Sequence, residues 1–405
     1  MFFKLGRFLQ ATYFGILTAS SSSLAQETPS NIELPTLSEE ARISLLTVAP
    51  GEAIHSIFGH CALRVNDPKL GIDAVYSYSA IITSQSRFFL ESSTENRNGI
   101  YSRSTFDQYI EHHTALSQEV RECILNLEQS QKQAFSDRLL NNYLHEERVY
   151  PYHPFSKNCA TLQWDLMWSL IGDKLILEQD LDEKTDLSYF EYIQPYFPPH
   201  PWTAIGTNLA LGARTHFDLT YGDRAFLPRL IEESAQNTFI QTPRGEEPLV
   251  AEQNVIVEGT TISTSIFTPK PIWLLLAILG ATIYITFKEV VTERYAANFD
   301  RLLMGVTSIL GAVLIYTSMH IAHDYSAYNF HLIWASPFHI FALLLPAKLK
   351  RGTRVYFRIY SLVFTLFVAV FFFATPALLI QMWPLLLALL IRATQISRHS
   401  ASNVS

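Results

Sequence analysis

Apolar and polar residues alternate in three short segments that follow one another between residues 43 and 78. The segments are Ile43–Val48, Cys61–Val65 and Ala74–Tyr78, and Pro, Gly, Asn and Asp residues lie between them. Alternation bounded by such turn residues predicts three successive β-strands. From Ser117 to His145 apolar residues recur at helical spacing instead, which predicts a helix, and a second helix is expected to begin near Cys159. The region up to residue 240 is therefore predicted to be an α+β domain.

Beyond residue 270 the pattern changes to long apolar runs. Three runs cover residues 271–287, 302–319 and 332–347, and residues 359–391 contain no Asp, Glu, Lys or Arg. As a helix this last stretch would be about 50 Å long, at 1.5 Å per residue. One membrane crossing needs only about 30 Å, so we predict a hairpin near Thr375 and five spans in total. Pro384 interrupts the fifth span, so four spans are an alternative.

The distribution of positive charge predicts how these spans are oriented. Lys and Arg residues cluster in alternate connections: Lys288, Arg294 and Arg301 in the first, Lys348, Lys350, Arg351, Arg354 and Arg358 in the second, and Arg392 and Arg398 near the C-terminus. The connection between residues 320 and 330 has neither Lys nor Arg. Because basic loops stay in the cytoplasm, the region before the spans is predicted to be exported.

The N-terminus has the pattern of a secretory signal. Lys4 and Arg7 precede an apolar run, and Ser23-Leu24-Ala25 offers small residues for cleavage. An uncleaved signal anchor is the alternative. The expected organisation is a signal peptide at 1–25, a periplasmic catalytic domain at 26–240, a linker at 241–270 that could contain one strand, a transmembrane domain of about five helices at 271–392 and a cytoplasmic tail at 393–405. We therefore predict a multi-pass protein of a bacterial inner membrane, with its N-terminal domain in the periplasm.

Composition narrows the class of protein further. The 405 residues are 48% hydrophobic and only 17% charged, with a net charge of -7. Ordinary soluble enzymes are more highly charged, and a nucleic-acid-binding protein needs a basic surface. The three cysteines, Cys61, Cys123 and Cys159, are too few for a disulfide scaffold and leave at least one free thiol.

Cys159 is a candidate nucleophile because of where it would lie in its helix. Asn158 is a good N-cap residue, and Leu162, Leu166 and Leu170 would form one apolar stripe of the helix. A cysteine in the first turn lies at the positive end of the helix dipole, which favours the reactive thiolate. The alternative is a buried structural cysteine.

His60 is the candidate general base. It follows Gly59 and begins a predicted strand, which would hold its imidazole rigidly. Cys61 would face the other side of the strand and is expected in the core. His55 is a rival base, and a purely structural role for His60 remains open.

Two further side chains could support the site. Arg64, on the same strand face as His60, could neutralise a phosphate or hold a carboxylate, or it could be a surface charge. Tyr78 could orient the imidazole or donate to an oxyanion, or it could be part of an aromatic core. We find no zinc-type spacing among the histidines and predict no metal and no cofactor.

Taken together, these segments resemble the Lnb-type lipoprotein N-acyltransferase family. The similarity lies in Pro50-Gly51, in Phe58-Gly-His-Cys-Ala-Leu-Arg-Val65 with Val75-Tyr-Ser-Tyr78, in Asn158-Cys-Ala-Thr161, in Leu211-Gly-Ala-Arg-Thr215 and Ala225-Phe-Leu-Pro228, and in the polytopic C-terminal region. The order His before Cys also resembles permuted papain-like enzymes of the NlpC and lecithin:retinol acyltransferase-like types. The resemblance implies a permuted papain-like domain followed by a helical transmembrane bundle.

The resemblance also implies a reaction and a set of residues. His60 and Cys159 would form the catalytic dyad, with Asn158, Arg64 and Tyr78 as possible support or substrate-binding residues. The expected activity moves an acyl chain from a phospholipid, through a cysteine thioester, to the N-terminal amine of a diacylglyceryl-cysteine lipoprotein. Two alternatives stay open: a periplasmic cysteine peptidase or amidase acting on peptidoglycan peptides, and a non-catalytic membrane receptor or assembly factor.

Overall fold

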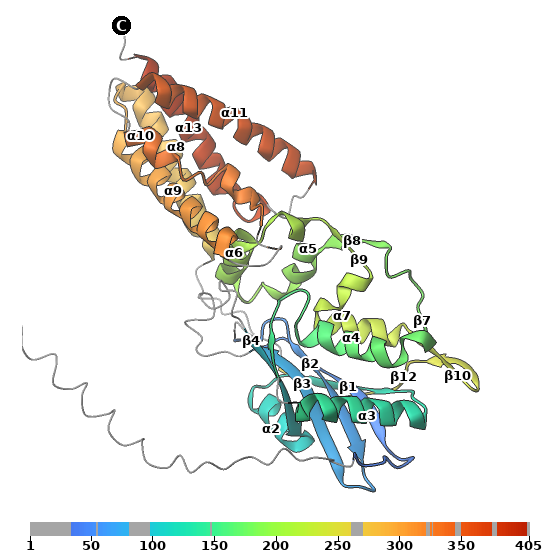
Figure 1. Ribbon diagram of the computed structural model, residues 1–405. Helices are drawn as coiled ribbons and strands as arrows, with labels where there is room; N and C mark the ends of the chain where they lie inside the picture. Colours follow the sequence, from blue (N-terminus) through green and yellow to red (C-terminus); the bar gives the residue numbers. More distant parts are fainter. Residues whose placement is uncertain are drawn as a thin grey trace, which may run out of the picture. The chain divides into compact units, whose positions relative to one another are not determined.

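The structure is a computed structural model (Figure 1), and it divides the chain into two units, residues 1–36 and residues 37–405. It describes residues 34–53, 56–80, 98–145, 148–260, 270–320, 325, 327–344, 350–374 and 379–402. The predicted signal peptide, His55 and the predicted hairpin at Thr375 lie outside these residues. Everything below concerns the unit that begins at Leu37.

A seven-stranded antiparallel sheet organises the first part of this unit, in the order β12-β5-β1-β2-β3-β4-β6. The three predicted strands are confirmed as its centre. The strands are β1 (Arg42–Val48), β2 (His60–Asp67), β3 (Ile72–Ala80), β4 (Asn98–Thr105), β5 (Val120–Leu125), β6 (Val149–Pro151) and β12 (Val250–Val257).

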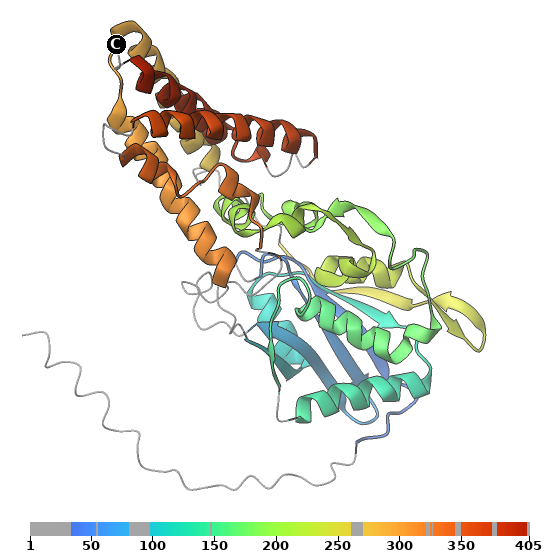
Figure 2. The ribbon, with the colours of Figure 1, turned by 45° about the horizontal axis from the view of Figure 1, so that its top comes forward.

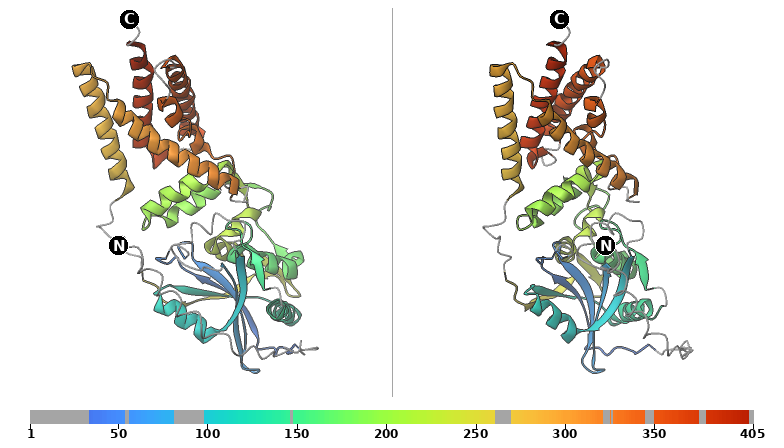
Figure 3. Two further views of the ribbon diagram at one scale, coloured as in Figure 1. Left: turned by 60° about the vertical axis from the view of Figure 1, so that its left-hand side comes forward. Right: turned by 90° about the vertical axis from the view of Figure 1, so that its left-hand side faces the viewer.

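Both faces of the sheet are covered by helices, as the period-two alternation of its strands requires. On β1, Ile43 and Leu45 belong to a core shared with α3 (Gln129–Leu144), α4 (Cys159–Ile171) and α7 (Pro228–Gln236). Leu46 and Val48 belong to a second core with α2 (Phe106–Ala115) on the opposite face. The views in Figures 1 and 3 show the sheet between these helices.

The predicted helix at 117–145 is wrong in its first part. Residues 120–125 form β5, which lies between β1 and β12, and the helix α3 begins only at Gln129. The sequence Val-Arg-Glu-Cys-Ile-Leu contains two β-branched residues, and five of its six residues are buried, as a strand between two others requires. Tertiary pairing thus overrides the helical spacing that the longer window suggested.

The predicted linker also differs from the structure in its first part. Residues 239–248 form a hairpin, and β12 pairs with β5, so the sheet extends to Val257. Residues 261–269 lie outside the described part. The remaining elements of this region are β7 (Leu175–Ile176), β8 (Lys184–Ser188), β9 (Asp218–Thr220), β10 (Phe239–Thr242), β11 (Gly245–Pro248), α5 (Tyr189–Ile193), α6 (Pro201–Ala210) and four 3-10 helices at Gly172–Lys174, Gln194–Tyr196, Ala213–His216 and Gly222–Phe226.

The C-terminal region consists of helices, which Figures 2 and 3 show from further directions. They are α8 (Pro271–Thr292), α9 (Ala297–His320), a 3-10 helix (Phe330–Ile333), α10 (His339–Leu344), α11 (Lys350–Ala374) and α13 (Trp383–Ser402). Among the described residues, three segments have the length and apolar composition of membrane spans, at Pro271–Thr292, Ala297–Met319 and Arg351–Phe373. α13 packs against α8, α9 and α11. The predicted number of five spans stays a prediction.

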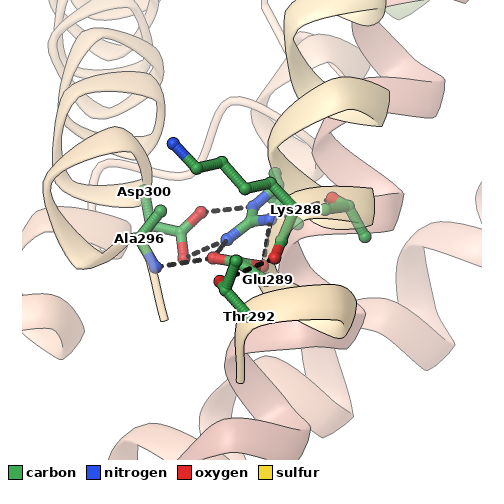
Figure 4. Close-up of polar contacts among 7 residues, drawn as sticks. Lys288, Glu289, Thr292, Ala296 and Asp300 are labelled. Carbon is green, nitrogen blue, oxygen red and sulfur yellow. Dashed lines mark hydrogen bonds and ion pairs between the residues drawn. The ribbon is translucent and has the colours of Figure 1, made fainter. Parts of the chain in front are cut away.

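A buried ion network joins three of these helices. Figure 4 shows Glu289 of α8 and Asp300 at the start of α9 facing one another. The guanidinium of Arg392, from α13, donates to both carboxylates at 2.6 to 2.9 Å. Arg392 also donates to Thr286 Oγ1 at 2.9 Å, and Glu289 accepts the backbone N–H of Ala296 at 2.7 Å. Arg392 and Asp300 are fully buried, so water does not solvate their charges, and the ion pairs and hydrogen bonds stabilise these charges instead.

The segment between α9 and α10 contacts the region around α6. The backbone N–H of Gly212 donates to Tyr325 O at 2.6 Å, and Asn329 Nδ2 donates to Leu209 O at 2.7 Å. The Tyr325 ring lies 4.7 Å from that of Phe155, four residues before Cys159. The helical region is thus linked by packing to the chain that leads into α4.

Candidate active site

Cys159 is the first residue of α4, and Asn158 caps this helix as predicted. Asn158 Oδ1 accepts the backbone N–H groups of Ala160 and Thr161 at 2.8 and 2.9 Å. Its Nδ2 donates to the carbonyls of Pro154 at 2.7 Å and Phe226 at 2.8 Å. A single buried amide therefore fixes the start of the helix to two other segments, and with it the position of Cys159.

The buried face of α4 differs from the predicted leucine stripe. Of the predicted stripe, Leu166 is buried in the core, whereas Leu162 and Leu170 are only partly buried. Ala160, Trp164, Met167 and Ile171 also point into the core. These four residues recur at intervals of three and four positions, so the buried face is broader than the predicted stripe. Cys159 therefore lies at the edge of the buried face, and its side chain is half-buried.

His60 begins β2, directly opposite Val48 of β1. Gly59 before it has a φ of +78°, and a Cβ there would lie 2.3 Å from Val48 O, so only glycine fits this tight approach. The half-buried imidazole of His60 lies close enough to the Cys159 side chain to lower the pKa of its thiol. The structure thus brings together the two residues on which the predicted dyad depends.

The surroundings of Cys159 favour its ionised form. A hydrogen bond from the Cys61 side chain, together with the charge and hydrogen bond of His60, holds the pKa of the Cys159 thiol well below its usual range. Burial acts in the opposite direction but is outweighed. A cysteine with a lowered pKa and partial exposure has the properties of a reactive thiol.

Cys61 is fully buried in the core on the α4 side of the sheet, as predicted. The prediction missed that this core position lies against Cys159. The Cys61 Sγ is 3.2 Å from the carbonyl oxygen of Cys159, to which its thiol donates. Burial and the contact with Cys159 raise the pKa of the Cys61 thiol well above its usual range, so it stays protonated.

Arg64 is bound by carboxylates of the chain itself. Its Nε and Nη2 donate to Asp73 at 2.7 Å each, and its Nη1 donates to Glu122 at 2.9 Å. The guanidinium also stacks on the Phe106 ring, and only 13% of the side chain is exposed. Of the predicted alternatives, Arg64 holds carboxylates and is not a surface charge. Arg64 thus links β2 to β3 and β5 by ion pairs, and these carboxylates occupy the guanidinium N–H groups that a substrate phosphate would need.

Tyr78 lies in an aromatic group formed by residues of β3, β4 and β6. Its ring is 4.5 Å from Tyr101 and 5.6 Å from Tyr150, and its hydroxyl accepts Asn142 Nδ2 at 3.5 Å. Burial raises the pKa of Tyr78. These contacts fit the core alternative better than an orienting role toward His60.

Gln163 is a positioning residue that the sequence analysis missed. It is fully buried one turn after Cys159, and its Nε2 donates to the carbonyl of Tyr76 on β3 at 2.9 Å. This bond fixes α4 against the sheet. The available signal was a glutamine four residues after the cysteine, on the side of the helix that faces the strands.

A cavity of about 290 Å³ adjoins the loop that leads to His60. Its walls include Val48, Phe58, Tyr196, His200 and Arg229, and Cys159 and His60 are not among its lining residues. Since Val48 pairs with His60, the cavity begins one strand away from the imidazole. Its walls are mostly apolar and carry a few polar and charged groups.

Comparison with known proteins agrees with this division into a sheet domain and a helical region. One family model, the Lnb N-terminal periplasmic domain, matches residues 36–190, and another, the Lnb transmembrane domain, matches residues 261–403. Searches of curated proteins and of solved structures give no significant match. The two models together cover more than half of the chain, which therefore belongs to the Lnb family. Family membership indicates a membrane enzyme of lipoprotein modification, with a periplasmic N-terminal domain and a C-terminal transmembrane domain.

Proposed function

We propose that this protein is a Cys-His acyltransferase that moves an acyl chain from a phospholipid to the N-terminal amine of a diacylglyceryl-cysteine lipoprotein. The observation that carries the proposal is the contact between the His60 imidazole and a Cys159 thiol of lowered pKa at the start of α4. A nucleophile at a helix start, paired with a histidine on a strand, is the arrangement of papain-like enzymes. We propose that the sheet domain is a permuted member of that class.

The first step forms the acyl-enzyme. His60 first takes the proton of the Cys159 thiol, and the thiolate then attacks the ester carbonyl of the phospholipid. The C–O bond of the ester then breaks, His60 gives its proton to the leaving alkoxide, and a lysophospholipid departs. The backbone N–H of Cys159, at the first position of α4, has no acceptor within the helix and would stabilise the oxyanion.

The second step transfers the chain. The neutral α-amine of the lipoprotein attacks the thioester, His60 removes its proton, and the C–S bond breaks to leave an amide and the free thiol. An α-amine has a pKa of about 8, so part of it is neutral near pH 7. Asn158 and Gln163 act as positioning residues in both steps because they hold the first turn of α4 in place.

The helical region supports this function by keeping the site near its substrates. We propose that it anchors the protein in the bacterial inner membrane by several spans, with the sheet domain in the periplasm. Both the phospholipid ester and the lipoprotein amine lie at the membrane surface, so anchoring raises their effective concentration at Cys159. We propose that the mostly apolar cavity at the Phe58 loop, which begins one strand away from His60, holds part of a substrate.

The test is mass spectrometry of lipoprotein N-termini from cells depleted of their own lipoprotein N-acyltransferase and expressing this chain. We expect a third, amide-linked acyl chain with the unaltered protein and none with Cys159→Ser or His60→Ala. Cys123→Ser is the matched control, since Cys123 is also a free cysteine but lies on β5. Free N-termini with altered cell-wall peptides would indicate the peptidase instead. Full acylation by Cys159→Ser at equal abundance would contradict a catalytic cysteine.

A further inference from the structure

Cys61 is a buried thiol that the proposed reaction does not use, yet it lies against the nucleophile. It follows His60 on β2, its exposed fraction is 0%, and it belongs to the core beneath α4. Its Sγ is 3.2 Å from the carbonyl oxygen of Cys159, and the two side chains are near enough for each to shift the pKa of the other. His60 and Cys61 thus reach the same residue from successive strand positions.

We propose that Cys61 is a positioning residue whose thiol holds the first turn of α4 in place and donates a hydrogen bond to the Cys159 thiolate. This inference rests on the proposed role of Cys159 as nucleophile. It assigns to the second thiol a function that neither strand alternation nor core burial suggested.

The chemistry of the two thiols makes the direction of this hydrogen bond definite. Cys61 has no exposed surface, and burial keeps its thiol protonated. Cys159 is half-buried and next to an imidazole, which favours its ionised form. A neutral S–H beside a thiolate can only be the donor, and hydrogen bonds to charged acceptors are the stronger kind.

The single S–H proton of Cys61 donates to the Cys159 carbonyl in the structure, and in the proposed cycle it alternates between this oxygen and the adjacent Cys159 sulfur. When Cys159 is ionised, the S–H points toward the sulfur and stabilises its charge. When Cys159 carries an acyl group its sulfur is uncharged and a weak acceptor, so the S–H returns to the Cys159 carbonyl. The S–H bond of Cys61 is not broken, and its thiol holds the start of α4 in place both when Cys159 is ionised and when it is acylated.

Cys123 provides a matched control because it has the same side chain in the same core. It is also fully buried, and burial raises its pKa to about 11. It lies on β5, opposite Leu45 of β1, two strands away from β2. Removing its thiol therefore changes the core by the same volume without touching Cys159.

The experiment measures the rate of alkylation of Cys159 by iodoacetamide as a function of pH, in the full chain in detergent, with mass spectrometry of the peptide that contains Cys159. We expect Cys61→Ala to raise the apparent pKa of this reaction by about one unit, so that alkylation below both pKa values slows about tenfold. Cys61→Ser, which keeps a donor, should remain close to the unaltered protein, and Cys123→Ala should leave the profile unchanged.

An unchanged profile in folded Cys61→Ala, or an equal shift in Cys123→Ala, would overturn the proposal. If Cys61→Ala does not fold, the infrared S–H stretch of Cys61 in Cys123→Ala serves instead. It should move to lower frequency as Cys159 ionises, and a band that does not move overturns the proposal. Alkylation needs no substrate, so this result is independent of whether the protein acylates lipoproteins.

Discussion

Asn158 offers the most quantitative test of how the nucleophile is positioned. Its amide makes four hydrogen bonds at 2.7 to 2.9 Å, two to N–H groups at the start of α4 and two to the carbonyls of Pro154 and Phe226. Only 5% of the residue is exposed, so water does not easily replace the lost partners. Asn158→Ala removes all four bonds at once.

The expected loss in the free energy of unfolding is the sum of contributions from the oxygen and the nitrogen of the amide. Losing an N-cap oxygen costs about 1 kcal/mol. Leaving two buried carbonyls without donors costs roughly 1 kcal/mol or more for each. The sum is about 3 kcal/mol, which lowers the Tm of a domain of this size by about 6 to 12 °C.

The assay is thermal unfolding of the full chain in detergent, followed by the fluorescence of Trp164, which packs in the core beneath α4. Asn158→Ser keeps a capping oxygen, so its Tm should fall by less than that of Asn158→Ala. Asn158→Asp keeps both acceptors but sets a carboxylate against the carbonyls of Pro154 and Phe226, so it should be unstable too. A Tm of Asn158→Ala within 2 °C of the unaltered protein would refute the reasoning.

Two further outcomes are expected elsewhere in the chain. Arg392→Leu leaves Glu289 and Asp300 buried without their cation, which destabilises the protein by about 3–5 kcal/mol and should lower the yield of folded protein extracted from the membrane. Replacing both acids by neutral residues in the same variant should restore the yield. An unchanged yield of Arg392→Leu alone contradicts this expectation. Burial lowers the pKa of His113 to about 4, so this side chain takes up a proton at a lower pH in the folded protein than in the unfolded chain. The free energy of unfolding therefore falls as the pH drops from about 6.5 toward 4. His113→Gln should flatten this pH dependence of Tm, the exposed neighbour His112→Gln should not, and equal slopes in all three proteins argue against it.

The central strands and the start of α4 could be predicted from sequence because their signals are local. Alternation in Ile43–Val48 and the capping chemistry of Asn158 depend on residues close together in the chain. The pairing of β5 and β12 could not be predicted in this way. It joins residues 120–125 to residues 250–257, and no short window of sequence contains both strands.

The same distinction applies to the site. His60 and Cys159 could be proposed because each residue type in its local setting has a chemical meaning, and a family resemblance joined them. The partners of Arg64 could not be foreseen, because Glu122 comes from a strand that was expected to be helix. The contact of Cys61 with Cys159 depends on how α4 crosses β2, which alternation along a single strand does not report.

The most direct test of the account is to look for an acyl group on Cys159. The full chain in detergent is mixed with a phospholipid whose acyl chain carries an isotope label, without acceptor, and the peptide that contains Cys159 is analysed by mass spectrometry. We expect one labelled acyl group on the Cys159 sulfur, removed by hydroxylamine, lost to an added diacylated lipopeptide and absent in His60→Ala. Transfer of label to the lipopeptide by Cys159→Ser, with no acyl group ever found on residue 159, would contradict the account.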